Sequence, residues 1–386
     1  APMAHHDQSN ARDEVVHLLA EHGFDGMAQA LETLFNEAMR LERSAVLGAG
    51  PYERTESRRG YANGFKPKTV TSRLGKLRLQ VPQTRGVEFY PSALERGERS
   101  ERALKLALAE MYVQGVSTRK VAEITRELCG CDVSSTQVSR AAEALDAELE
   151  VWRNRPLGAT PYLILDARYE KVRHGGSVVD CAVLIAIGVT PAGRRSILGV
   201  SVSLSEAEVH WRSFLTSLVD RGLHGVRLIT SDDHAGLGQA RRACLPSVPW
   251  QRCQFHLMQN ALHYVPKLSM RREVGGNLRG VWNAPDRTEA ERQLALLVKK
   301  YQTAAPKLAA WLEANVPEGL TVFALPAEHR RRLRTSNPLE RLNEEIKRRT
   351  RVATLFPNEA SLLRLVTAIL QETSEDWETG KIYLKL

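Results

Sequence analysis

The chain has 386 residues, of which 43% are hydrophobic and 26% charged. This is a globular composition in a chain too long for one simple core. Lys and Arg (54) outnumber Asp and Glu (45), and the net charge of +9 favours a polyanionic partner such as nucleic acid. No apolar run reaches the roughly 18 residues that cross a bilayer, and the polar start lacks a signal peptide, so we expect a cytoplasmic protein with no membrane partner.

The first part of the chain, residues 1–98, predicts helices followed by a small sheet. Apolar spacing indicates two helices in 11–48, broken near "HGFDG", and residues 49–90 are rich in Gly, Arg and Tyr with a strand or hairpin pattern. This stretch is either a solvated linker with a small sheet or a segment that binds along DNA. The second interpretation is based on Arg, Lys and Tyr, whose side chains suit contacts with phosphates and bases. In the second interpretation the candidate DNA contacts are Arg58, Arg59, Tyr61, Lys66 and Lys68.

Residues 99–155 predict a helical region with a helix-turn-helix pattern. Ser117 can cap a helix that runs to Leu128, "CGCD" makes a turn, and Ser134 or Ser135 can cap a second helix. Such a second helix would present polar side chains to the major groove of DNA, whereas a plain helical hairpin is the alternative. The candidate DNA contacts here are Arg119, Gln137 and Arg140.

After a Pro/Gly linker the pattern changes to alternating strands and helices. The predicted strands are 161–168, 177–190, 194–203, 225–232 and 249–256, with helices at 205–221 and near 235–243. This order describes a mixed five-stranded sheet with flanking helices. The stretch 257–335 is helical and basic, and helices at 336–352 and 359–376 follow it. We therefore expect a multidomain α/β protein with five parts: 1–98, 99–155, 156–256, 257–335 and 336–386.

Three carboxylates are candidates for one site. Asp166 and Asp232 each end an apolar strand, and Glu340 lies on a later helix that could complete the cluster. Three carboxylates repel one another unless they are protonated or bind cations, and oxygen ligands select Mg²⁺ or Mn²⁺. Two such ions promote phosphoryl transfer, which agrees with the basic charge. Taken singly, each acid is ordinary as a cap or a solvated residue.

Four ordered blocks carry a resemblance over nearly the whole chain: "LDARYEKVR", "LITSDDHAGL", "WQRCQFHLMQN" and "TSNPLERLNEEIKRRTRVATLFPNEASLLRLV". They resemble the Mutator-type transposases of bacterial insertion sequences. The resemblance implies an RNase H-like catalytic core with a DDE triad on Asp166, Asp232 and Glu340, two Mg²⁺ or Mn²⁺ ions per site, and a helical insertion before the Glu. Glu344, one helical turn beyond Glu340, is the competing acid.

The same resemblance implies the partners and the reaction. It implies double-stranded DNA as terminal inverted repeats and target, a homodimer, a circular excised intermediate, and a bacterial cytoplasm with association to the nucleoid. Further candidate DNA contacts are Lys347, Arg348, Arg349, Arg351, His256 and Trp282, although Trp282 suits a helical core better than a base stack. Two rival functions are an RNase H-like nuclease or resolvase without strand transfer, and a non-catalytic DNA-binding regulator derived from a transposase.

Overall fold

The computed structural model of the chain describes residues 8–94, 96–97, 100–351 and 355–386. The chain separates into two compact units, Ala1–Ala144 and Leu145–Leu386. The five parts expected from the sequence are a finer division than these two units and remain a prediction.

The first unit begins with helices and a long β-hairpin. Helix α1 (Gln8–His22) is followed by a short 3-10 helix at "GFDG", by α2 (Met27–Leu47), and by strands β1 (Tyr61–Ser72) and β2 (Gly75–Arg85). The antiparallel hairpin alternates, so that Leu77 and Leu79 of β2 pack with Met39 of α2 in a small core.

Three short helices complete the first unit: α3 (Arg102–Val113), α4 (Thr118–Cys129) and α5 (Ser135–Glu143). The predicted caps are confirmed: Ser117 accepts a hydrogen bond from the Lys120 backbone, and Ser134 forms a capping box with Gln137. Gly130 ends α4 with φ +61°, a left-handed conformation that favours glycine. Leu104, Leu108, Val121 and Val138 form the core of these helices.

The second unit contains the predicted mixed five-stranded sheet. After α6 (Asp146–Arg153) come β3 (Tyr162–His174), β4 (Ser177–Val189), β5 (Arg195–Ser203), β6 (Leu228–Ser231) and β7 (Trp250–Arg252), in the spatial order β5-β4-β3-β6-β7. Strands β3, β4 and β5 are antiparallel neighbours, whereas β6 runs parallel to β3 and β7 runs parallel to β6. The predicted last strand, 249–256, was too long, because helix α9 already begins at Gln254.

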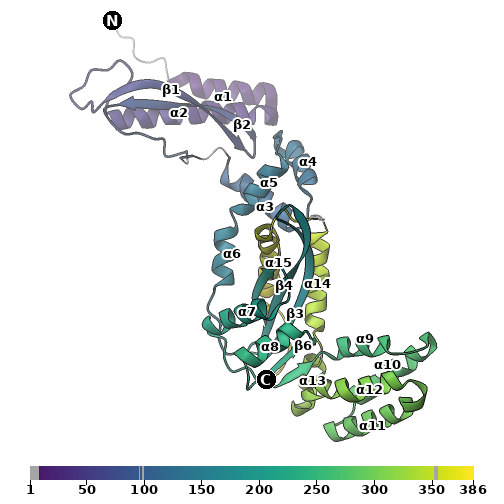
Figure 1. Ribbon diagram of the computed structural model, residues 1–386. Helices are drawn as coiled ribbons and strands as arrows, with labels where there is room; N and C mark the ends of the chain where they lie inside the picture. The colour runs from purple at the N-terminus through teal and green to yellow at the C-terminus, as the bar shows by residue number, and fades with distance from the viewer. Residues whose placement is uncertain (1–7, 95, 98–99, 352–354) are drawn as a thin grey trace. The chain divides into compact units, whose positions relative to one another are not determined.

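Helices cover both faces of this sheet (Figure 1). Leu163 and Leu165 of β3 pack against α7 (Glu208–Asp220) and α8 (Ala235–Cys244). Successive strand residues face opposite sides, so Asp166 faces the side of α14 (Asn337–Thr350). Helix α15 (Glu359–Thr379) packs on β5 and β3.

The segment between β7 and α14 is helical, as predicted. It comprises α9 (Gln254–His263), α10 (Arg271–Trp282), α11 (Arg287–Ala304), α12 (Pro306–Asn315) and α13 (Ala327–Leu333), with three short 3-10 helices at Leu268–Met270, Val316–Gly319 and Thr321–Ala324. Helices α9 to α12 pack beside one another (Figure 1) around an apolar core that includes Trp282. Among the described residues, no helix is both long and apolar enough to cross a membrane.

Candidate active site

Asp166 and Asp232 lie on neighbouring parallel strands. Tyr162 pairs with Leu228 and Ile164 with Thr230, and the same register continued by two residues sets Asp166 beside Asp232. Neighbouring strands are about 4.8 Å apart, so the two acids share one side of the strand pair. The sheet therefore brings two of the three predicted acids together.

The position of Asp166 within its strand differs from the prediction. We expected Asp166 to end its strand, but β3 continues to His174 because β4 pairs with it along its whole length. Strand β6 ends at Ser231, immediately before Asp232. The two acids therefore lie where β6 leaves the sheet and one side of β3 loses its strand neighbour.

Burial and a neighbouring charge dominate the chemistry of Asp166. Its side chain is only 8% exposed. Burial and then the charge of Asp232 raise the pKa of this carboxyl to about 7, although His256 opposes the shift. The Asn343 side-chain amide donates a hydrogen bond to Asp166 Oδ2 over 3.2 Å. The buried carboxyl is therefore costly to ionise, and a cation bound beside it would favour its ionised form.

Helix α14 is attached along β3 by polar contacts. Besides the bond from Asn343 to Asp166, Arg168 donates to the Asn343 carbonyl and Thr350 Oγ1 donates to Glu170 over 3.3 Å. Glu340 lies three residues before Asn343 and therefore on the same helix face. These contacts direct Glu340 toward the side of β3 that carries Asp166.

The surroundings of the three glutamates on α14 differ. Burial raises the pKa of Glu340, and its Oε1 is buried without a hydrogen-bond partner. Glu344 is exposed to solvent. Hydrogen bonds from Arg348 and then Arg349 lower the pKa of Glu345 to about 2, so its carboxylate is already neutralised. This pattern favours Glu340 as the third acid of the site.

His256, on the first turn of α9, interacts with all three acids. Its contact with Cys253 and then the charges of Asp232 and Asp166 raise its pKa to about 9, against the effect of burial. The charge of His256 in turn lowers the pKa of Glu340. The imidazole is therefore protonated at neutral pH and partly neutralises the acids.

Cys253 connects β6, the strand that precedes Asp232, to the start of α14, the helix that carries Glu340. Its backbone N–H donates to the Ser231 carbonyl over 2.7 Å, and its Sγ accepts from both N and Oγ of Ser336 at 3.3 Å. Both side chains are fully buried. The Ser336 carbonyl then accepts hydrogen bonds from the backbone N–H groups of Leu339 and Glu340 in the first turn of α14. Through Ser336, Cys253 therefore fixes the start of α14 and with it the position of Glu340.

The donor set fits a hard divalent ion only in part. Carboxylate oxygens suit Mg²⁺ or Mn²⁺, and both the raised pKa of Asp166 and the unpartnered Glu340 Oε1 are relieved by a cation. In the described part of the chain, however, no three His, Cys, Asp or Glu side chains converge closely enough to hold a metal ion. Asp166 and Asp232 could hold a cation as they stand, whereas Glu340 would have to move closer.

Sequence reasoning did not single out three residues near this site. Asn343 follows Glu340 at helical spacing, which is a usable signal. Glu206 lies in the loop between β5 and α7, where its charge raises the pKa of Asp166 and it pairs with His234 at 3.7 Å. Neither Glu206 nor Ser336 has a sequence pattern that indicates its place.

Asp233, beside the second acid, has another partner. Its carboxylate lies 3.0 Å from Arg252 Nη1, a buried guanidinium that also contacts Glu318. Asp233 is thus paired with a cation of its own, which favours Asp232 over Asp233 as the second acid of the site.

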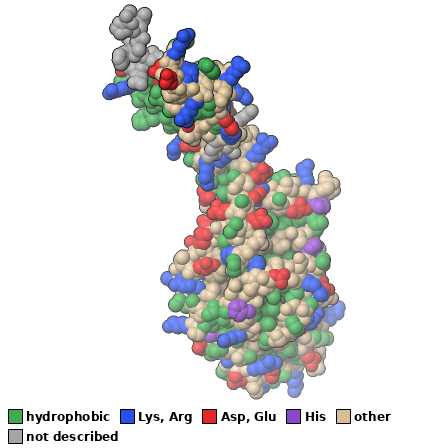
Figure 2. Space-filling model, turned by 90° about the vertical axis from the view of Figure 1, so that its left-hand side faces the viewer, with side chains coloured by type: hydrophobic (Ala, Val, Ile, Leu, Met, Phe, Trp, Pro, Cys, Tyr) green, Lys and Arg blue, Asp and Glu red, His purple; other side chains and the backbone are tan. Residues whose placement is uncertain are grey.

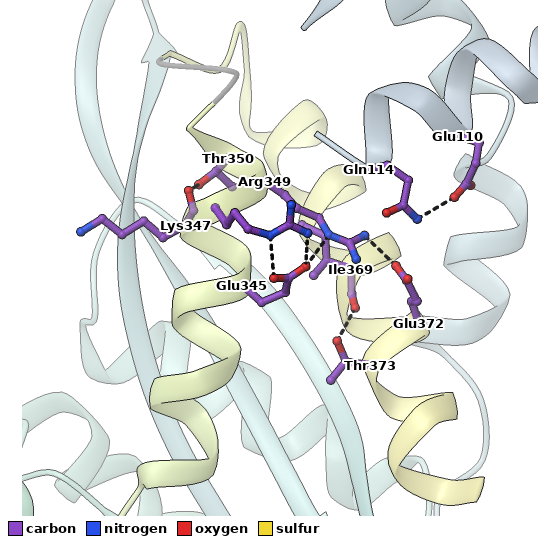
Figure 3. Close-up of polar contacts among 10 residues, drawn as sticks. Glu110, Gln114, Glu345, Lys347, Arg349, Thr350, Ile369, Glu372 and Thr373 are labelled. Carbon is purple, nitrogen blue, oxygen red and sulfur yellow. Dashed lines mark hydrogen bonds and ion pairs between the residues drawn. The ribbon is translucent and has the colours of Figure 1, made fainter. Parts of the chain in front are cut away.

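The basic residues of α14 do not form one free surface. Arg349 is 7% exposed and lies between Glu345 and Glu372, while Lys347 points away from this cluster (Figure 3). Arg348 pairs with Glu345 at 2.7 Å. Lys347 and Arg351 are exposed and have no acidic partner among the described residues, which leaves them as the accessible cations of this helix.

The other candidate DNA contacts fall into two groups. Arg59, Tyr61, Lys66, Arg119 and Arg140 are exposed, and so is Gln137, although its carbonyl accepts a hydrogen bond from Ser134 in the capping box. Four others are engaged within the fold. The Arg58 guanidinium donates to loop carbonyls, Lys68 bonds to Tyr90, His256 lies among the acids, and Trp282 is 8% exposed in the helical core.

Comparison with known proteins identifies the family. The family model described as "Transposase, Mutator family" matches residues 3–380. The chain belongs to the Mutator family of transposases. It is 59% identical over 384 residues to the transposase for insertion sequence element IS406 of Burkholderia multivorans, with 99% of each chain covered. It is 45% identical to the transposase for ISRM5 of Rhizobium meliloti, over 94% of this chain and 91% of that one. It is also 38% identical to the transposase for IS256 in transposon Tn4001 of Staphylococcus aureus, over 90% of each.

Proposed function

We propose that this protein is a DNA transposase that cleaves and joins DNA strands with Asp166, Asp232 and Glu340 as a DDE triad. One observation carries the proposal: Asp166 and Asp232 share a register on neighbouring parallel strands, and Asn343 ties the helix of Glu340 to Asp166. Family membership across the chain supports the same reaction.

We further propose an RNase H-like catalytic core. Three antiparallel strands followed by two parallel ones, in the order β5-β4-β3-β6-β7, support this fold, with helices on both faces. The helical stretch from α9 to α13 is then an insertion between the last strand and the helix of the Glu.

Asp166 and Asp232 would hold two Mg²⁺ or Mn²⁺ ions, with Glu340 completing the site once DNA is bound. When bound, such ions lower the pKa of a nucleophilic water or hydroxyl and stabilise the leaving oxygen. Asn343 fixes one oxygen of Asp166, so its other oxygen remains available. Protonated His256 lowers the mutual repulsion of the acids before DNA arrives.

The reaction has two displacements at phosphorus. In the first, a water oxygen loses a proton to solvent and bonds to phosphorus at an end of the element, the bond to the 3′ oxygen breaks, and that oxygen takes up a proton to become a 3′-OH. In the second, the freed 3′-OH attacks another phosphate and releases a different 3′-OH. The first displacement is a hydrolysis and the second exchanges one phosphodiester bond for another, so neither step needs an outside energy source.

The partners follow from this reaction. We propose that the protein binds the terminal inverted repeats of its element, brings two ends together as a homodimer with two-fold symmetry, and moves through a circular excised intermediate. It would act in the bacterial cytoplasm, at the nucleoid.

A labelled duplex of the element's end, incubated with the protein and Mg²⁺ or Mn²⁺, tests the proposal. The expected products are a cleaved strand and a longer joined strand, both absent without metal and both lost in Asp166→Asn and Asp232→Asn. Cleavage without joining would instead indicate a nuclease or resolvase. DNA binding without any reaction in either metal would indicate a regulator.

A further inference from the structure

The first unit contains a large open cavity between α2, the following loop and β1. Its volume is about 1080 Å³, and its wall includes Arg43, Tyr52, Arg54, Tyr61 and Phe65. This volume slightly exceeds the range of about 300–1,000 Å³ that is typical of small-molecule pockets. The cavity is large enough for a nucleotide, and its wall combines cations with aromatic rings.

Arg43 is a buried cation without an anionic partner. Its side chain is 8% exposed, and it makes no ion pair or hydrogen bond with any described residue. Burial and the charge of Arg40 lower its pKa. Both guanidinium groups lie over the ring of Phe65, at 5.0 Å for Arg43 and 5.4 Å for Arg40. A buried guanidinium is costly unless it is paired, so this position favours an incoming anion.

Three aromatic rings at the cavity are open to solvent. The exposed fractions are 104% for Tyr52, 64% for Tyr61 and 42% for Phe65. Tyr52 has φ +60° and is the only non-glycine residue with positive φ in the described ranges. A β-branched or aromatic residue in this conformation is strained, and such strain concentrates at functional positions. Solvent-exposed rings beside arginines are the means by which proteins stack unpaired bases.

The loop that forms the cavity is held in place by its own hydrogen bonds. Thr55 Oγ1 and Ser57 Oγ both donate to the Gly48 carbonyl, at 3.1 and 2.9 Å, and Arg58 donates to the Gly50 carbonyl at 3.3 Å. Gly48 has φ +67°, and a Cβ there would lie 2.4 Å from the Ser57 carbonyl oxygen. Arg58, a predicted DNA contact, therefore shapes this loop, which leaves Arg43 and the exposed Arg54 as the cavity-wall arginines with no hydrogen-bond or ion-pair partner among the described residues.

We infer that this cavity binds one unpaired nucleotide of DNA, with its phosphate on Arg43 and its base stacked on Tyr52. The inference rests on the proposed function only for the identity of the polyanion. Two acids also line the cavity: Glu53, whose carboxylate accepts from the Gly50 backbone N–H over 2.8 Å, and Glu56. Arg43, Arg54 and Arg58 outnumber them, so the cavity keeps a positive balance.

The test uses the full chain and a single-stranded oligonucleotide of the element's end that carries one 2-aminopurine. Anisotropy gives the affinity, and quenching of the 2-aminopurine reports base stacking. Arg43→Gln removes the cation, and Tyr52→Gly removes the ring while accepting a positive φ. Arg78→Gln is the matched control, because Arg78 is exposed on β2, outside the cavity wall, and loses the same charge. Tyr52→Phe and Arg43→Lys keep the ring and the charge.

We expect Arg43→Gln to weaken binding about tenfold and to reduce the salt dependence by roughly one phosphate contact, whereas Arg78→Gln stays within about twofold. Tyr52→Gly should abolish the quenching and weaken binding by about 5- to 100-fold, the range for one stacked base, while Tyr52→Phe retains both. Thermal unfolding of each variant shows whether the fold is intact.

Equal losses in Arg43→Gln and Arg78→Gln, or unchanged quenching in Tyr52→Gly, would overturn the inference. In that case metal-dependent strand transfer by the intact protein would leave the proposed function standing. If the intact protein binds neither single-stranded nor duplex DNA, both fail.

Discussion

Asp166 is the residue where fold stability and function conflict. Its pKa is about 7 in the folded protein, against an ordinary value of 3.8. Because the folded state holds the proton more tightly than the unfolded chain, this group lowers stability progressively as pH rises from about 4 to 7, and the loss stays constant above that range.

We therefore expect Asp166→Asn to stabilise the metal-free protein at pH 8, by roughly 1–4 kcal/mol, and to have little effect below pH 4. Thermal unfolding at several pH values measures this. Mg²⁺ should raise the Tm of the intact protein at pH 8 but not that of the variant. Asp180→Asn is the control, because Asp180 forms only an exposed pair with Lys171. A lower Tm for Asp166→Asn at pH 8 would contradict the conclusion that ionised Asp166 destabilises the metal-free protein.

At this scale the sequence predicted the acids better than their surroundings. Asp166 and Asp232 each follow an apolar run, a pattern that predicts a shared edge, although Asp166 lies within β3 and only Asp232 follows the end of its strand. The cation His256, the acid Glu206 and the Cys253–Ser336 contact depend on segments that meet only in the folded chain. The spacing of residues along the sequence does not specify such long-range contacts.

Among the elements, helix α8 is held close to the loop before α7. A Cβ on Gly236 would lie 2.2 Å from the Glu206 carbonyl oxygen, whereas a Cβ on Gly238 meets only the flexible end of Arg242 at 3.6 Å. We predict that Gly236→Ala destabilises the protein by more than about 2 kcal/mol, while Gly238→Ala is neutral or stabilising by up to about 1 kcal/mol. Chemical denaturation of the two variants tests this, and equal effects would contradict it.

The start of α14 depends on an acceptor at position 253. Cys253→Ala should leave the buried N–H and O–H of Ser336 unpaired, at a cost of about 1–3 kcal/mol, and should slow DNA cleavage by displacing Glu340. Cys253→Ser keeps an acceptor and should recover most of both. If the alanine variant cleaves DNA at the normal rate, Cys253 does not position Glu340.

The sequence predicted the elements of the sheet but not all their lengths. Strand β3 runs beyond Asp166 through polar residues, because there β4 is its only strand neighbour, apart from one bridge between Val172 and Phe356, and its sides are partly exposed. Only Val172 is buried in that half. An apolar sequence pattern therefore predicts the part of a strand that is buried under helices, and it misses the part that forms strand pairs while exposed to solvent.

For the whole molecule, the net charge of +9 predicts salt-dependent DNA binding. On the face shown in Figure 2, however, basic side chains are interspersed with acidic and apolar ones. The contribution of each cation therefore depends on whether an acid already neutralises it.

The difference between neutralised and free cations gives a prediction for α14. The double variant Lys347→Gln/Arg351→Gln should weaken duplex binding and lower the magnitude of the salt slope by roughly 2, with an unchanged Tm. Arg349→Gln should leave the slope unchanged and cost about 1–3 kcal/mol of stability, because it leaves Glu345 and Glu372 without their buried partner. Salt titrations and thermal unfolding separate the two. A salt slope that falls in Arg349→Gln at normal stability would mean that Arg349 contacts DNA.

The most direct test of the central claim compares Glu340→Gln with Glu344→Gln in strand transfer on a duplex of the element's end. Both changes remove one carboxylate from the same helix, four residues apart. We predict that Glu340→Gln abolishes metal-dependent cleavage and joining while still binding DNA, and that Glu344→Gln retains both activities. Activity in Glu340→Gln, with loss in Glu344→Gln, would contradict the proposed triad.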